Sequence, residues 1–281
     1  MAVNIQKGLA AAGLAPLHVW NRTASKAEPV QAEGAIVEPS LESLASKCSL
    51  IFAMTFDDAA LESAFSAIST LSNKSNDGKN KILVTCSTVA PSLVQQLEHK
   101  TKSVSVLSAP VFGRPDAAAA KMLVAVLAGG SETEKNHVAK YLEYTTRKIT
   151  RLGGPAHTAN VLKLTGNFCI LSVIEMLAQA QTLAEKNGVP REAVVDVVSA
   201  LMPGPIVTGY SERIARDEFD VGFTVDGGLK DVGLMRDLAS SSSVSLPFAD
   251  IAHGHLERQK AENKDLDWAS LAKIVRKDSH L

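Results

Sequence analysis

A stripe of polar side chains with helical spacing is the strongest sign of chemistry in this sequence. Asn160, Lys163 and Asn167 fall at i, i+3 and i+7 within the stretch 156–187, whose other positions are mostly apolar. Polar groups on a buried helix need partners. A partly desolvated Lys163 can donate a proton to a developing alkoxide while Asn167 holds either the substrate or the lysine. The alternative is an interdomain salt bridge, which the spacing alone slightly favours.

The elements that must position this stripe fall into two groups. Up to residue 153, β-branched and apolar runs alternate with short helical stretches, which indicates a parallel sheet covered on both faces. From 156–187 onward the spacing is helical to the end of the chain. We predict an α/β, doubly wound Rossmann-type domain over 1–153, followed by an all-helical domain over 154–281 that holds substrate or forms a dimer. The expected strands are 16–20, 35–37, 50–56, 81–85, 104–111, 122–128 and 149–152, and the expected helices before 153 are 2–12, 40–47, 58–71, 91–100 and 132–144.

Composition excludes several classes of function. The chain has 281 residues, 46% of them hydrophobic, and a net charge of −1, which suits a folded protein with a large core. Its basic residues are spread out, so no nucleic-acid partner is expected. Its three cysteines show neither paired nor metal-ligand spacing, so we expect no metal site and a reducing compartment. The apolar stretch 168–177 is too short to span a bilayer, so no membrane partner is expected.

The beginning of the chain departs from a doubly wound fold. Such a fold opens with a strand and a glycine-rich turn that holds the pyrophosphate at a helix N-terminus. Here helical spacing starts at the first residues, and no G-x-G-x-x-G occurs in the sequence. The absent strand would be central, so its two neighbours should each have an unpaired edge. We therefore expect an incomplete N-terminus and weak cofactor binding. The first 27 residues carry no acid, which makes a mitochondrial location the alternative to a cytoplasmic one.

Two basic residues outside the stripe have both a functional and an ordinary interpretation. Arg22 follows the short run 16–20, where an arginine favours the 2′-phosphate of NADP through a charge-assisted hydrogen bond worth roughly 1.5–3 kcal/mol. An equally good interpretation is that Thr23 caps a helix and Arg22 is an ordinary solvated charge. Lys230, which precedes Asp231 near a helix start, is a second candidate for a buried functional lysine, but an ordinary surface ion pair is the simpler interpretation of these two residues.

Several short motifs occur in order along nearly the whole chain. Together they resemble the β-hydroxyacid dehydrogenase family, which includes 3-hydroxyisobutyrate dehydrogenase, glyoxylate reductase and, more distantly, 6-phosphogluconate dehydrogenase. The motifs are Val19-Trp20-Asn21-Arg22-Thr23, Met54 with Asp57-Asp58, Cys86-Ser87-Thr88-Val89-Ala90-Pro91, Ala109-Pro110-Val111, Lys163-Leu164 with Asn167, and Lys230-Asp231.

The resemblance implies hydride transfer between a nicotinamide cofactor and a small hydroxy acid, aldehyde or ketone. NADP is the expected cofactor, with NAD as the alternative. Lys163 matches the general acid and base of the family, and Asn167 matches a residue that helps to hold the substrate. The family also suggests a homodimer or homotetramer built through the helical domain. The residues that match cofactor contacts are Asn21, Arg22 and Thr23 at the adenosine phosphate, Met54, Ser87 and Thr88 along the cofactor, and Lys230 at the nicotinamide end.

Two departures from the family pattern affect substrate and activity. Phe112-Gly113-Arg114 stands where relatives carry Ser-Gly-Gly. Phe112 removes a hydroxyl and adds bulk, and Arg114 either pairs with a carboxylate or faces solvent, so a bulkier carbonyl or an imine becomes an alternative substrate. The absent glycine turn leaves a second alternative, a catalytically impaired homologue or a helical dimerisation or binding module without a pyrophosphate site.

Overall fold

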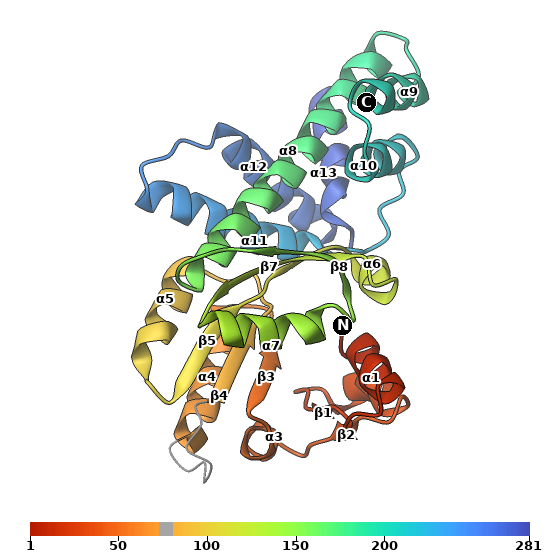
Figure 1. The fold of residues 1–281 in the computed structure, drawn as a ribbon. Coiled ribbons are helices and arrows are strands. Elements are labelled where there is room, and N and C mark those ends of the chain that lie inside the picture. The colour runs from red at the N-terminus through yellow and green to blue at the C-terminus, as the bar shows by residue number, and fades with distance from the viewer. Residues whose placement is uncertain (73–80) are drawn as a thin grey trace. The chain divides into compact units, whose positions relative to one another are not determined.

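A computed structural model describes residues 1–72 and 81–281 of the chain (Figure 1). Contacts within the chain divide it into two units, residues 1–163 and 164–281. The division falls inside α8 (His157–Lys186), a helix of 30 residues. The α/β unit therefore contains the first turns of α8, and the helical unit contains the rest.

A six-stranded sheet forms the centre of the α/β unit. Its order is β3-β4-β5-β7-β6, with β8 paired along Leu123–Leu127 of β7, on the edge opposite β6. The strands β3 (Leu50–Ala53), β4 (Lys81–Thr85) and β5 (Val104–Ser108) are parallel, but β7 (Leu123–Gly129) runs antiparallel to β5 and to β6 (Val111–Phe112). The prediction of an all-parallel sheet is wrong for β7 because the chain between β6 and β7, including α6 (Pro115–Ala119), is too short for a parallel crossover. The last strand, β8 (Thr146–Arg151), is parallel to β7.

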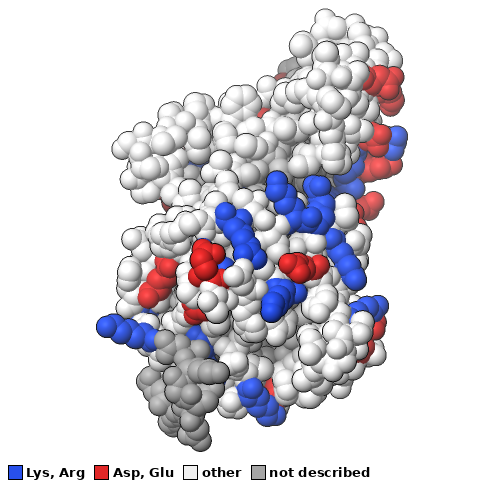
Figure 2. All heavy atoms as spheres, viewed as in Figure 1, with Lys and Arg blue, Asp and Glu red and all other residues white. Residues whose placement is uncertain are grey.

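Helices cover both faces of this sheet, as predicted. Successive strand residues point to opposite faces: Leu83 belongs to the core shared with α4 (Asp58–Ser72) and α5 (Pro91–Lys100), whereas Val84 belongs to the core shared with α7 (Glu132–Leu142). Among the described strands, β8 pairs only with β7, and it exposes Arg147 and Lys148. Figure 2 shows Lys and Arg side chains over β8 and α7, and such charges discourage edge-to-edge pairing with another sheet.

The first forty residues of the chain include a second, two-stranded parallel sheet. It pairs β1 (His18–Val19) with β2 (Ile36–Val37), and the helices around it are α1 (Ala2–Ala11), η1 (Ala24–Ala27), α2 (Glu28–Gln31) and α3 (Leu41–Lys47). Among the strands that the structure describes, β1 pairs with β2 alone and β3 with β4 alone. Each therefore has one edge that is unpaired among the described strands. The predicted strand 50–56 ends at Ala53, and Met54 and Phe56 beyond it are exposed rather than buried.

The helical unit packs the rest of α8 against the helices that follow it. Residues 164–281, all of them described, contain one isolated bridge between Thr224 and Asp267 and no strand. By length and apolar composition α8 alone among the described helices could cross a membrane, although buried core helices of soluble proteins meet the same criteria. The apolar character therefore extends along more of the chain than the stretch 168–177 identified from the sequence. The helices of the unit are α9 (Arg191–Leu201), α10 (Pro205–Ala215), α11 (Val225–Ser241), α12 (Pro247–Asn263), η2 (Trp268–Ser270) and α13 (Leu271–Asp278).

Candidate active site

The first turns of α8 dock closely against the sheet of the α/β unit. Gly129, at the end of β7, adopts φ +87°, and a Cβ there would lie 2.6 Å from the Cβ of Ala156. One turn later, Ala159 packs with Val126 and Ala128 of β7. Small residues at these positions let the helix approach the strand, and the same helix face then carries Asn160 and Lys163.

Asn160 connects α8 to the carboxyl ends of three parallel strands. Its side chain is fully buried. The hydroxyl of Ser108, the last residue of β5, donates to Asn160 Oδ1 at 2.5 Å, and Asn160 Nδ2 donates to the Ser87 carbonyl after β4 at 3.4 Å. Ser87 Oγ in turn accepts a hydrogen bond from the backbone N–H of Thr55, after β3, at 2.7 Å. The sequence predicts that Asn160 needs partners, but Ser108 and Thr55 were not among the predicted site residues.

Lys163 lies one turn further along α8 with its ammonium group against an aromatic ring. Only 7% of Lys163 is exposed, and its Nζ lies 4.1 Å from the centroid of the Phe112 ring. That ring is partly buried against the cluster of Val126, Ala128 and Ala159. The structure thus brings together a predicted catalytic residue and a predicted substrate residue. Burial beside the carboxyl ends of the strands gives the amine a position suited to proton transfer.

The backbone turn directly after Phe112 requires a glycine at position 113. Gly113 has φ +133°, and a Cβ there would come within 2.5 Å of Leu123 Cδ2. Arg114 comes next, as the N-cap residue of α6, and Asp116 lies in the first turn of that helix. The tight turn ends β6 directly after Phe112 and so fixes where its side chain begins.

Within the helical unit, a buried carboxylate joins two further predicted residues. Asn167 Nδ2 donates to Asp231 Oδ2 at 2.6 Å, and Lys230 Nζ lies 2.7 Å from Asp231 Oδ1. Only 1% of Asp231 is exposed, so the interpretation of Lys230 and Asp231 as an ordinary surface pair is wrong. Asp231 was not predicted as a site residue. Its position next to Lys230 in the sequence was the one feature that could have identified it. Its two oxygens orient the Asn167 amide and the Lys230 ammonium.

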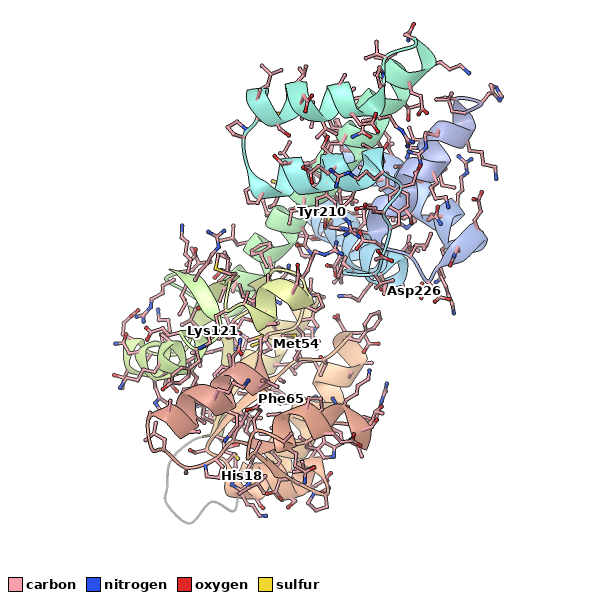
Figure 3. The ribbon with its side chains drawn as sticks, turned by 90° about the vertical axis from the view of Figure 1, so that its right-hand side faces the viewer. His18, Met54, Phe65, Lys121, Tyr210 and Asp226 are labelled. Atoms are coloured by element: carbon pink, nitrogen blue, oxygen red, sulfur yellow. The ribbon has the colours of Figure 1, made fainter. Side chains whose placement is uncertain are left out.

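The predicted cofactor residues follow the carboxyl ends of strands. The exposed residues Arg22 and Thr23 come after β1, and the Asn21 side chain accepts a hydrogen bond from the Thr23 backbone N–H at 2.9 Å. Thr23 stands at the N-cap of η1, although its side chain makes no capping bond. Met54, 58% exposed, is visible after β3 in Figure 3, and Thr88 follows β4. Polar and apolar groups at strand ends suit the two halves of a dinucleotide. The described residues contain no cluster of three His, Cys, Asp or Glu side chains able to hold a metal.

A buried glutamate connects the two short strands β1 and β2, which lie next in sequence to the loop that carries Arg22. Glu38 follows β2 and accepts hydrogen bonds from Lys47 Nζ at 2.8 Å and Ser43 Oγ at 2.6 Å, and it lies 2.6 Å from His18 Nδ1. The hydrogen bonds from Lys47, Ser43 and His18 lower the pKa of Glu38 to about 2. The ionised carboxylate thereby connects β1, β2 and α3.

Comparisons with known proteins agree on one family. The family model described as the NAD binding domain of 6-phosphogluconate dehydrogenase matches residues 1–154. The model for the NAD-binding region of NADP-dependent 3-hydroxyisobutyrate dehydrogenase matches residues 158–275. The chain is 31% identical over 265 residues to the uncharacterized oxidoreductase YfjR of Bacillus subtilis (strain 168), with 92% of this chain and 91% of that protein covered.

Two further comparisons extend this result. Mitochondrial 3-hydroxyisobutyrate dehydrogenase of Drosophila melanogaster is 26% identical over 267 residues, covering 90% of this chain and 79% of that protein. The structure of Mycobacterium tuberculosis 3-hydroxyisobutyrate dehydrogenase with L-serine superposes with a TM-score of 0.82 at 21% identity, over 98% of this chain and 95% of that one, which supports the fold. The first family model alone spans more than half of the chain. The chain belongs to the β-hydroxyacid dehydrogenase family and is an oxidoreductase that uses NAD(P).

Proposed function

We propose that the protein interconverts a small hydroxy acid and the corresponding aldehyde or ketone with NADP, and that Lys163 is its general acid and base. The observation that carries this proposal is the burial of Lys163 on α8, one turn from the network at the strand ends. Asn167, one turn further along α8, is the residue proposed to hold the substrate. The name of the Drosophila relative supports a small hydroxy acid as the substrate class.

When bound, the cofactor supplies a hydride to the carbonyl carbon during reduction. Lys163 Nζ donates a proton to the carbonyl oxygen and becomes a neutral amine, which solvent reprotonates. In oxidation the neutral amine removes the hydroxyl proton. The protein therefore contributes orientation and one proton, and a positioned general acid accelerates turnover by about 10²–10⁴-fold.

The experiment is a comparison of wild type with Lys163→Met and Lys163→Arg at saturating NADPH. We expect kcat to fall by about 10²–10⁴-fold in Lys163→Met, because no proton donor replaces the amine. Lys163→Arg keeps the charge but gives up a proton too reluctantly to restore the rate. NADPH affinity, measured by nicotinamide fluorescence, should stay within about twofold of wild type in both variants. Full turnover in Lys163→Met would refute the assignment.

Arg22 supports a preference for NADP over NAD. Its guanidinium is exposed on the loop after β1, and a charge-assisted fork to a 2′-phosphate is worth roughly 1.5–3 kcal/mol. Arg22→Ala should therefore lower kcat/KM for NADPH by about 10–150-fold and leave that for NADH nearly unchanged. Equal losses with both cofactors would contradict the preference.

We also propose that the protein assembles as a homodimer or homotetramer through the helical unit. None of the residues of α9 is buried, and Val197 and Leu201 on this helix are 58% and 74% exposed. Exposed apolar side chains gathered on one helix suit a contact between subunits. Light scattering of wild type and Val197→Glu tests this proposal, and a monomeric wild type would contradict it.

A further inference from the structure

We propose that Phe112 is a positioning residue, which fixes the ammonium group of Lys163 through the face of its ring; this inference rests on the proposed role of Lys163. The distance of 4.1 Å from Lys163 Nζ to the ring centroid is well within the range of about 6 Å over which a cation is attracted to an aromatic face. The attraction is strongest where water is excluded, and Lys163 is 7% exposed.

The ring can position the lysine because it is itself held from behind. Phe112 pairs with Val124 in the antiparallel register of β6 and β7. Its side chain packs against a cluster that includes Val126 and Ala159, and the turn at Gly113 ends the strand immediately after it. The ring is thus fixed by a strand, by packing and by a turn.

This arrangement limits the freedom of a long side chain. A lysine has a flexible four-carbon stem, and its amine samples many positions unless another group holds it. Ala159 lies one turn before Lys163 on α8 and packs in the same cluster as Phe112. The Phe112 ring therefore contacts the helix that carries the lysine as well as the lysine Nζ. The ring therefore sets where the transferable proton lies relative to the strand ends.

The test replaces Phe112 with Leu, which keeps apolar bulk but removes the ring face, and with Tyr, which keeps the face. We expect kcat of Phe112→Leu to fall by roughly 3–30-fold, with KM for the carbonyl substrate within about twofold of wild type. Phe112→Tyr should restore kcat to within about threefold of wild type. Phe52→Leu is the matched control: its ring pairs with Tyr141 at 6.0 Å in the same unit, so its loss should leave kcat unchanged.

A double variant separates action through Lys163 from a general packing defect. In a Lys163→Met background, Phe112→Leu should cause no further fall in kcat, because the group that the ring positions is gone. A full additional loss in that background would overturn the positioning role, as would wild-type kcat in Phe112→Leu. These results differ from failure of the proposed function, in which Lys163→Met itself would turn over at the wild-type rate.

Discussion

Replacing Asn160 with Leu removes the connection between α8 and the strand ends while nearly preserving side-chain volume. Asn160 is fully buried, so the variant leaves the Ser108 hydroxyl and the Ser87 carbonyl without the partners that they now have. We expect the α/β unit to lose stability and turnover to fall, because Lys163 lies on the next turn of the same helix.

The size of the loss follows from the two hydrogen bonds. A buried polar group without a partner costs about 1–3 kcal/mol. The bond to the Ser87 carbonyl is long, at 3.4 Å, so it contributes at the lower end. The sum is roughly 2–4 kcal/mol, or a fall in melting temperature of about 5–15 °C for a unit of this size. Ser108→Ala should cost about 1–2 kcal/mol, and the double variant less than the sum by about 1 kcal/mol, because both singles break the same 2.5 Å bond.

Thermal and urea unfolding, followed by circular dichroism, measure these differences. Asn187→Leu is the matched control, since Asn187 is exposed just beyond the other end of α8 and should change stability by less than about 0.5 kcal/mol. An Asn160→Leu variant as stable as this control, or Ser108 and Asn160 losses that simply add, would show that the buried hydrogen bonds do not stabilise the unit as described.

Two predictions concern the beginning of the chain. Gly8→Ala should destabilise the packing of α1 by about 1–3 kcal/mol, because an added Cβ would lie 2.2 Å from the Tyr144 ring; a Gly8→Ala, Tyr144→Leu double variant that melts no higher than the single would contradict this cause. Glu38, whose pKa is lowered chiefly by its hydrogen bond from Lys47, contributes stability that is complete above its ordinary pKa of 4.5 and is lost as the pH falls toward about 2. Melting temperatures between pH 5.5 and 3 should therefore fall more steeply for wild type than for Glu38→Gln, and parallel curves would show that the carboxylate is not responsible.

Much of the fold follows from local sequence signals. The run Lys81–Thr85 and the helix Pro91–Lys100 have the predicted bounds, because β-branched residues form the first and a proline opens the second. Strand direction could not be predicted in the same way. An apolar run such as Leu123–Gly129 has the same pattern whether it runs parallel or antiparallel to its neighbours, and only the length of the connection distinguishes the two.

The candidate site shows a similar division. The polar stripe of Asn160, Lys163 and Asn167 follows from helical spacing. The partners of these residues come from strands and helices far away in the chain: Ser108 is 52 residues from Asn160, and Asp231 is 64 from Asn167. Spacing within one segment holds no information on such contacts, so these two partners appear only once the chain is folded.

The enzymatic account is tested by the rate of NADPH oxidation in the presence of small aldehydes, keto acids and cyclic imines, together with NADP reduction by 3-hydroxy acids and a fluorescence titration of NADPH binding. The account predicts saturable NADPH binding, turnover with at least one small carbonyl compound, and loss of that turnover in Lys163→Met. A protein that neither changes nicotinamide fluorescence nor consumes NADPH with any of these compounds would contradict it.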